Sequence, residues 1–232
     1  MIDNSREKIL KRIKAGLKNA HPEAMNTLKP GFIGPKPTPS AMEDERSTLI
    51  EQFASEVNMV NGKAQIIRDR NEINENVLNI FNQYKAKTFM IWDTPFLDFL
   101  KLKDFLKVNG FINVQSEHKE TLADVNIGIT EVDYAIADSG TLVLMTDTGK
   151  QRLDSLIVPI HVAVLESTKI IRNIFELIDI LDNELVNNNG LKRLPGCITF
   201  ITGPSRTADI EFILTLGVHG PKELQVLITD LD

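Results

Sequence analysis

The sequence of 232 residues contains a single cysteine, Cys197. One cysteine cannot form a disulfide within the chain, and it cannot supply the set of thiolates that holds an iron–sulfur cluster. Because Cys197 lies just before an apolar run, we expect a buried and unreactive thiol rather than a nucleophile.

Histidines are also few, and none of the four lies in a spacing typical of a metal site. Neither an HxxxH nor an HExxH pair occurs, so no metal site is predicted. The glycine-rich dinucleotide fingerprint, the phosphate-binding loop that ends in Gly-Lys-Ser or Gly-Lys-Thr, and the G-x-S-x-G turn are missing as well. The sequence thus gives no support to a zinc hydrolase, a serine hydrolase or an enzyme with either of those nucleotide-binding motifs.

Long apolar runs are missing too, since the chain has neither a signal-peptide core nor 18 consecutive apolar residues. Lys and Arg number 26 against 32 Asp and Glu, a formal net charge of −6. A general affinity for nucleic acid or for an anionic membrane surface is therefore not expected, and any anion site must be local. With 42% hydrophobic and 25% charged residues, we expect a globular cytoplasmic protein without membrane insertion.

Residues 1–39 are predicted to form an appendage to a domain at residues 40–232. Asn4 and Glu7 fit a capping box, and the apolar residues that follow lie on one helical face among lysines. Prolines between residues 28 and 39 exclude a helix or an interior strand there and predict an extended linker. The first helix would then dock on its own domain, on a second copy in a homo-oligomer, or on a partner.

The domain itself alternates between strand and helix patterns. Thr94-Pro95 supplies a helix N-cap with proline at the first helical position, and Asn109-Gly110 ends that helix. Alternation with short links predicts an α/β fold of three layers, α/β/α, in which helices cover both faces of a largely parallel, mixed sheet. Ligands of such sheets bind at the carboxyl ends of the strands. The predicted elements are strands at 64–67, 88–92, 111–114, 160–165 and 198–201, and helices at 72–84, 94–109 and 170–185, the last with Ile and Leu side chains that we expect to be core.

A strand, a turn and a helix are predicted around Gly203. Residues 198–201 favour a strand, Gly203 and the proline after it break the strand, and from Ser205 the pattern predicts a helix that Gly217 ends. Such a turn directs unpaired backbone N–H groups and the positive end of a helix dipole at one point, where Arg206 adds a forked cation. The stretch therefore predicts a site for a small anion.

A purely structural interpretation of the same stretch stays open. Ser205 or Thr207 would then only cap the helix. Arg206 would pair with Asp209 or Glu211 instead of binding a ligand. A cap of this kind and an anion site have the same sequence pattern, so the pattern alone does not separate them.

A second polar cluster lies between two apolar, strand-like runs at residues 134–137 and 142–145. A tight turn at Asp138-Ser139-Gly140-Thr141 joins the two runs and predicts a hairpin. Ordinary hairpin chemistry, in which Gly140 supplies a positive φ, accounts for the local pattern. The polar side chains of the turn are also candidates for a ligand site.

Three stretches together resemble the LUD domain of the lactate utilisation protein C family. They are Ala-Asp-Ser-Gly-Thr-Leu at residues 137–142, Gly-Pro-Ser-Arg-Thr-Ala-Asp-Ile-Glu at 203–211 and Gly-Val-His-Gly-Pro at 217–221. The resemblance covers residues 128–221 and is looser before them. It implies a fold similar to the superfamily of ribose-5-phosphate isomerase, glucosamine-phosphate deaminase and CoA-transferase (NagB/RpiA/CoA-transferase-like).

The resemblance also implies a role in bacterial L-lactate oxidation, with iron–sulfur clusters carried by partner subunits and no cofactor in this chain. We expect a cluster-free accessory subunit that binds a small carboxylate, a phosphate or a cofactor fragment at Gly203 to Thr207. The alternative is a stand-alone enzyme of the sugar-phosphate isomerase or acyl/CoA-transfer type, in which Glu131, Asp138 or His219 acts as the base.

The candidate residues are polar or turn-forming positions of these clusters. A lone histidine at the start of a strand, as His161 is, is more often structural than catalytic. The ligand-binding candidates are Thr130, Ser139, Gly140, Thr141, Arg152, Thr202, Gly203, Pro204, Ser205, Arg206, Thr207, Asp209, His219 and Gly220, and the catalytic candidates are Glu131, Asp138 and His219.

Overall fold

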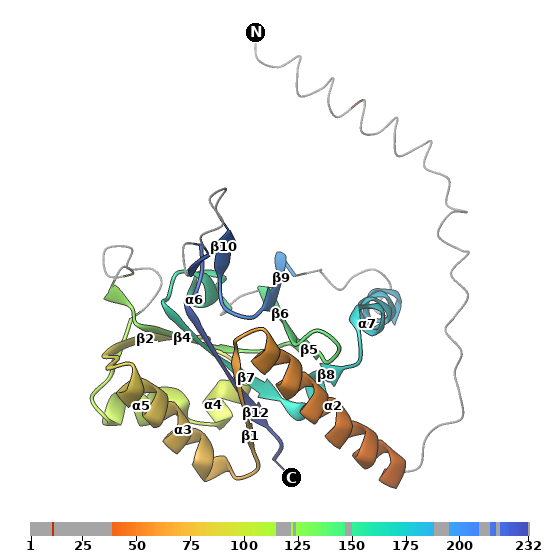
Figure 1. Cartoon of the computed structure of the whole chain (residues 1–232), viewed down its shortest axis with the longest axis horizontal. Helices are drawn as coiled ribbons and strands as arrows, with labels where there is room; N and C mark the ends of the chain where they lie inside the picture. The colour runs from red at the N-terminus through yellow and green to blue at the C-terminus, as the bar shows by residue number, and fades with distance from the viewer. Residues whose placement is uncertain are drawn as a thin grey trace. The chain divides into compact units, whose positions relative to one another are not determined.

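The computed structural model (Figure 1) describes residues 11, 39–114, 122, 124–146, 150–187, 195–208, 214–216 and 219–231. The chain divides into a unit of residues 1–41 and a unit of residues 42–232. The predicted capping box at Asn4 and Glu7 and nearly all of the predicted linker lie outside the described residues. The second unit carries every feature discussed below.

A parallel sheet of six strands forms the centre of the second unit (Figure 1). All five pairs of neighbouring strands in it run parallel. The α/β fold with a mostly parallel central sheet is thereby confirmed. In spatial order the strands are β1 (Lys63–Ile67), β12 (Glu223–Thr229), β7 (Ile160–Glu166), β4 (Ile127–Glu131), β2 (Thr88–Ile91) and β3 (Ile112–Asn113).

The helices between the first strands follow the predicted signals, with one difference. Asp69 caps α3 (Arg70–Gln83), and Thr94 caps α4 (Pro95–Phe99) by accepting a hydrogen bond from the Leu97 N–H. The single helix expected at 94–109 is two helices, because Lys101 adopts a left-handed conformation with φ of 56° before α5 (Leu102–Val108). The prediction missed this break because lysine carries no helix-breaking signal.

One hydrophobic core joins the main sheet to α3 and to α2 (Pro39–Met59). Among its fully buried side chains are Phe53 of α2, Phe81 of α3, and Phe89 and Trp92 from β2 and the residue after it. Burying one aromatic side chain of this size stabilises the fold by roughly 1.5–3 kcal/mol. These rings fix α2 and α3 against the sheet.

A second sheet of four strands continues from the first. Its order is β8 (Ile170–Ile171), β5 (Tyr134–Ile136), β6 (Thr141–Thr146) and β9 (Cys197–Thr202). Strands β5 and β6 form the predicted hairpin, and Gly140 has the expected positive φ of 61°. Among the described strands, the antiparallel pairs therefore lie in this second sheet and in a two-stranded ribbon. The central sheet contains none of them.

The two sheets are joined at the carboxyl ends of β4 and β7. Residues 132–133 lead from β4 into β5, and a single turn of 3₁₀ helix, Ser167–Lys169, leads from β7 into β8. Strands β4 and β7, which are neighbours in the main sheet, thus lead into β5 and β8, which are neighbours in the second sheet.

The helix predicted at 170–185 begins later and is less buried than expected. Ile170 and Ile171 are strand β8, and the helix α7 runs from Ile174 to Asn187. Leu177 is buried, but 53% of Ile178 is exposed. The expectation of uniform core packing was wrong here, because a helix on the outside of a sheet buries only one face.

The described residues that follow Ser205 in the predicted helix form strands instead. Arg206–Ala208 is strand β10, which pairs antiparallel with β11 (Leu214–Leu216). Cap-forming residues at 205–209 suggested a helix start, but they also favour turns and strand ends. The β-branched and aromatic residues of 207–216 in the sequence favour strand pairing, which prevails.

Candidate functional site

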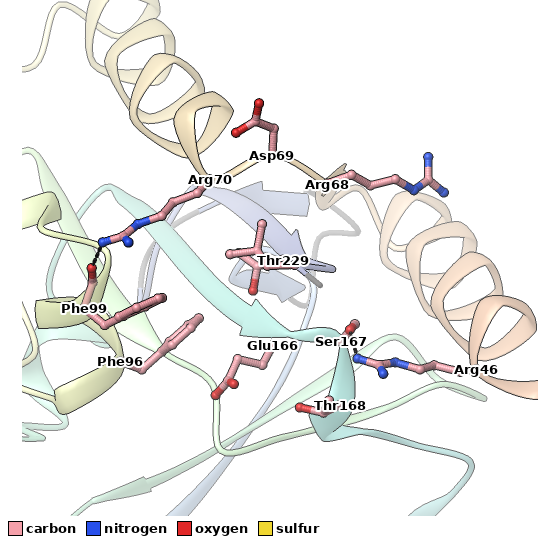
Figure 2. Close-up of a pocket in the computed structure, with 11 residues that line it drawn as sticks. Arg46, Arg68, Asp69, Arg70, Phe96, Phe99, Glu166, Ser167, Thr168 and Thr229 are labelled. Atoms are coloured by element: carbon pink, nitrogen blue, oxygen red, sulfur yellow. Dashed lines mark hydrogen bonds between the residues drawn. The ribbon is translucent and has the colours of Figure 1, made fainter. Parts of the chain in front are cut away.

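A pocket of about 700 Å³ lies at the carboxyl ends of the parallel strands (Figure 2). Its walls come from the segments after β1, β7 and β12, together with α2 and α4. Parallel strands end at one edge of a sheet, so their following loops meet there and form the usual ligand site of such folds. The lining residues are Arg46, Arg68, Asp69, Arg70, Phe96, Phe99, Glu166, Ser167, Thr168, Thr229 and Leu231.

Arg46 of α2 is held at this pocket by two polar partners. Its Nη2 donates a hydrogen bond of 2.5 Å to the Ser167 hydroxyl oxygen and lies 3.6 Å from an Asp230 carboxylate oxygen. The Ser167 hydroxyl in turn donates to Asp230 over 2.7 Å. Figure 2 shows the Arg46 side chain reaching from α2 to Ser167. Ser167 and Asp230 thus hold the Arg46 guanidinium at the border of the pocket.

Arg70 is oriented by Phe99 across the pocket. Its Nη2 donates a hydrogen bond to the Phe99 carbonyl oxygen, and its Cζ lies 4.2 Å from the centroid of the Phe99 ring. The planar guanidinium therefore stacks on the ring. Among the residues that the structure describes, neither Arg68 nor Arg70 has a carboxylate partner, and both are exposed.

Glu131 lies at the end of β4, in a buried ion network beside the pocket. Lys169 Nζ contacts a Glu131 carboxylate oxygen and lies 2.9 Å from Glu166. Burial alone would raise the pKa of Glu131, but the Lys169 ammonium and the Thr94 hydroxyl hold it below its ordinary value. A carboxylate kept ionised in this way is a weaker base.

The predicted hairpin residues form a chain of hydroxyl groups. Ser139 and Thr141 are 2.8 Å apart between their side-chain oxygens, and Thr141 and Thr202 are also 2.8 Å apart. Asp138 of the same turn is exposed. The structure thus brings the hairpin turn and the end of β9 together, which the sequence alone does not show.

Both glycines of these turns lie against the end of α2. A Cβ at Gly140 would be 2.6 Å from the Val57 backbone nitrogen, and one at Gly203 would be 2.5 Å from the Val60 carbonyl oxygen. Gly203 also has a φ of 75°. Close approach of the helix backbone and the left-handed conformation therefore explain these glycines without a ligand.

Arg206 interacts with the same helix end. Its Nη2 donates to the Val60 carbonyl oxygen over 2.5 Å, where α2 has just ended. Asp209 and Glu211, the partners considered from the sequence, lie outside the described residues, and the Thr207 side chain does too. With a strand in place of the predicted helix, the dipole argument for an anion site at this turn no longer holds.

The remaining turn residues meet near α6 (Leu153–Leu156). The Ser205 N–H donates to the Pro221 carbonyl oxygen over 2.8 Å, and a Cβ at Gly220 would be 3.1 Å from that of Ser205 and 4.0 Å from the Leu156 carbonyl oxygen. His219 beside them is exposed, and Pro204 is half-buried. Of the three catalytic candidates, Asp138 and His219 are exposed, whereas Glu131 is buried against Lys169.

Cys197 is half-buried rather than fully buried as expected. Hydrogen bonds to its sulfur from Thr199 and from Arg152, whose Nη1 lies 4.0 Å from Sγ, lower its pKa. The thiol is at the strand edge, where an arginine can reach it, because β9 is partly exposed.

A buried polar group lies between α6 and the main sheet. Thr130 Oγ1 and His161 Nε2 are 2.8 Å apart, and both residues are buried. Gly128, the register partner of His161, lies against Asp154, since a Cβ there would be 1.8 Å from the Asp154 carbonyl oxygen. His161 Nδ1 and Asp154 Oδ1 are buried without a hydrogen-bond partner.

Burial shifts the pKa values of Asp154 and His161 so that the neutral form of each side chain is favoured. It raises the pKa of Asp154 from 3.8 to about 6 and lowers the pKa of His161 from 6.5 to about 4. Neutral His161 is therefore the form present near pH 7, and it binds Thr130 as part of the fold.

Sequence reasoning missed the arginines of the pocket. Arg68 and Arg70 directly follow the predicted strand at 64–67 and precede the predicted helix at 72–84, which is the position of a ligand-binding loop in a parallel sheet. This signal was available. Arg46 and Ser167 join them only through the tertiary fold, and no local pattern announces that.

The described part of the chain contains no cluster of three or more His, Cys, Asp or Glu residues that could hold a metal ion. Within the same part, no helix has the length and apolar character needed to cross a membrane. The pocket lining contains three arginines and two phenylalanines beside the carboxylates of Asp69 and Glu166.

Comparison with known proteins assigns the chain to a family. The family model of the LUD domain matches residues 50–229, so the chain belongs to the LUD domain family. The fold is similar to that of a DUF162 family protein from Deinococcus radiodurans, with a TM-score of 0.56 and 18% identity over 79% of this chain and 98% of that one. This likeness concerns the fold alone.

Similar proteins include several called lactate utilization protein C. The one from Halalkalibacterium halodurans is 35% identical over 62% of this chain and 63% of its own length, and the one from Shouchella clausii is 32% identical over 64% and 65%. The one from Macrococcus caseolyticus is 32% identical over 68% of both chains. The chain thus matches a little under two thirds of the length of the first two relatives.

Proposed function

We propose that this LUD domain protein is an accessory component of a lactate utilisation system and that it binds a small anion in the arginine-lined pocket. Its similarity to proteins called lactate utilization protein C supports the first part. The second part rests on one observation, the presence of Arg46, Arg68 and Arg70 in the lining of one pocket at the carboxyl edge of the parallel sheet.

Arg68 and Arg70 are the cations that a ligand would meet. Arg46 is already engaged by Ser167 and Asp230, whereas the other two have no carboxylate partner in the described part of the chain. A guanidinium binds carboxylate or phosphate oxygens through two parallel hydrogen bonds. The proposal therefore moves the anion from the Gly203 turn to this pocket.

The chain would act in the cytoplasm together with subunits that hold iron–sulfur clusters, because its single cysteine supplies no cluster of its own. Protein purified without oxygen should then contain neither iron nor sulfide, and lactate oxidation should need the added partner subunits. Stoichiometric iron and sulfide in the isolated chain would contradict this part. A stand-alone isomerase or acyl transferase gains no specific support, since Asp138 and His219 are exposed and Lys169 keeps Glu131 ionised.

The anion site is tested by comparing two arginine variants. We expect L-lactate, pyruvate or inorganic phosphate to stabilise the wild type against heat, and Arg68→Ala to weaken binding by roughly 1.5–3 kcal/mol, about ten- to a hundredfold. Arg68→Lys should recover only part, because an ammonium lacks the fork. Arg206→Ala should leave binding unchanged.

The opposite binding result for the two variants would place the anion site at the Gly203 turn. Loss of binding in Arg206→Ala with normal binding in Arg68→Ala would support the Gly203 turn and reject the pocket. Absence of any stabilisation by these anions would reject the anion-binding part while leaving the role in lactate utilisation open.

A further inference from the structure

The pocket is much larger than a small acid requires. Its volume of about 700 Å³ falls in the range of sites that bury a drug-sized ligand, typically about 300–1,000 Å³. A three-carbon hydroxy acid would fill only a small part of it. The anion that binds the arginines is therefore expected to be one end of a larger molecule.

Two phenylalanine rings form an aromatic wall in the same pocket. Phe96 and Phe99 both come from α4, and Figure 2 shows both rings directed from this helix into the pocket. Phe99 is 56% exposed. A large apolar ring that stays exposed inside a cationic pocket is a surface suited to a flat partner.

The aromatic wall is combined with two cations, of which the Arg70 guanidinium is planar. The Arg70 guanidinium stacks on Phe99 at 4.2 Å, and Lys169 Nζ lies 5.6 Å from the centroid of Phe96. Stacked arginine and phenylalanine side chains are the surfaces on which proteins bind nucleobases and similar flat rings. The pocket thus offers a stacking surface and a separate anion-binding group, Arg68, on the loop after β1.

We infer that the pocket binds a phosphate-bearing compound with a planar aromatic ring, of the nucleotide class. The ring stacks against Phe99 and Arg70, and the phosphate contacts Arg68 and the free donors of Arg46. This inference rests on the proposed anion site and specifies its ligand. It does not require a glycine-rich fingerprint, since the arginine side chains replace backbone N–H groups as the phosphate donors.

The test separates the ring from the phosphate. Isothermal titration of the full chain would compare adenosine 5′-monophosphate with ribose 5-phosphate, adenosine and inorganic phosphate. Because stacking of one base contributes about five- to a hundredfold in affinity, adenosine 5′-monophosphate should bind that much more tightly than ribose 5-phosphate.

Variants of Phe99 assign this difference to the pocket. Phe99→Ala should bring adenosine 5′-monophosphate down to the affinity of ribose 5-phosphate and leave ribose 5-phosphate unchanged. Phe99→Leu keeps an apolar side chain and should lose most of the ring-dependent gain as well. Phe175→Ala, which removes a ring that is 73% exposed on α7, is the matched control and should change nothing.

The outcomes are distinguishable from those of the proposed function. Equal affinities of the two phosphates for the wild type, or a gain from adenine that survives in Phe99→Ala, would overturn the inference. If lactate or phosphate still bound in an Arg68-dependent manner, the anion site would stand without it. Circular dichroism of each variant verifies that the fold is intact.

Discussion

Replacing Asp154 by Asn should change how stability depends on pH. Asp154 is buried, one oxygen of its carboxyl group has no hydrogen-bond partner, and burial raises the pKa of this group to about 6. Asparagine has the same shape and does not ionise. The Asp154→Asn variant therefore removes the titration and keeps the packing.

The magnitude follows from the difference between the folded and unfolded pKa. Between pH 3.8 and about 6 the folded state keeps a proton on Asp154 that the unfolded chain releases. The contribution of Asp154 to the free energy of unfolding then falls by about 1.4 kcal/mol per pH unit in this window, up to about 3 kcal/mol in total. Above pH 6 both states are ionised, so the loss stops growing.

His161 has the opposite effect in nearly the same window. Burial holds it neutral in the folded state down to about pH 4, whereas the unfolded chain takes up a proton below 6.5. Its contribution is complete above pH 6.5 and is lost as the pH falls towards 4. In the wild type the two contributions largely cancel, and Asp154→Asn should expose the one from His161.

Urea denaturation between pH 4 and pH 8 provides the assay. The free energy of unfolding of Asp154→Asn minus that of the wild type should increase by up to about 3 kcal/mol from pH 4 to pH 6 and stay constant above pH 6.5. A difference that stays flat over the whole range would refute the reasoning, because it would mean that the Asp154 carboxyl group titrates alike in both states.

Three further substitutions test the packing described above by denaturation. Gly203→Ala should lower the free energy of unfolding by more than about 2 kcal/mol, because the residue has a positive φ and its Cβ would meet the carbonyl at the end of α2. Gly110 also has a positive φ, but a Cβ there would have nothing within 4 Å, so Gly110→Ala should cost only about 1 kcal/mol. Lys169→Met should cost about 3–5 kcal/mol by leaving the Glu131 carboxylate buried without its partner, and adding Glu131→Gln should restore part of that loss. Arg206→Ala should cost no more than about 1 kcal/mol, since this side chain is exposed, and a larger loss would give the arginine a structural importance that one hydrogen bond does not explain.

The alternation of strands and helices in residues 63–113 was predictable because each boundary has a local cause. The side chains of Asp69 and Thr94 cap the helices that follow them, and Gly110 has the positive φ that suits the end of a helix. The hairpin around Gly140 was predictable for the same reason. Local signals such as these act within a few residues, so one sequence is enough to find them.

Features decided by distant contacts were not predictable. The cap-like residues at 205–209 suggested a helix, but pairing with Leu214–Leu216 makes a strand. The strand at Glu223–Thr229 was not identified, although it lies in the middle of the main sheet. Glu131 was proposed as a base, and its burial against Lys169 depends on a residue 38 positions away.

The candidate site also has one feature that the sequence predicts and others that depend on distant contacts. The position of a ligand at the carboxyl ends of the strands follows from the parallel sheet that the sequence predicted. Arg46, Phe99 and Ser167 could not be assigned to the site in the same way, because they come from three different elements. A pocket of this kind is a property of strand order, and strand order is set by packing rather than by any local sequence pattern.

The place of β12 also governs how the chain can fold during synthesis. This strand lies between β1 and β7. The Lys63 side chain at the start of β1 forms an ion pair with that of Glu223, which is 160 residues further along. Until residues 223–229 have left the ribosome, β1 lacks its described neighbour, and the exposed edges of β1 and β7 can pair with other chains. Closing so long a loop is slow compared with forming the local βα units. Nascent chains should therefore depend on a holdase chaperone until β12 arrives, and mutations in β12 should lower the yield of soluble protein more than those in β3 at the edge of the sheet.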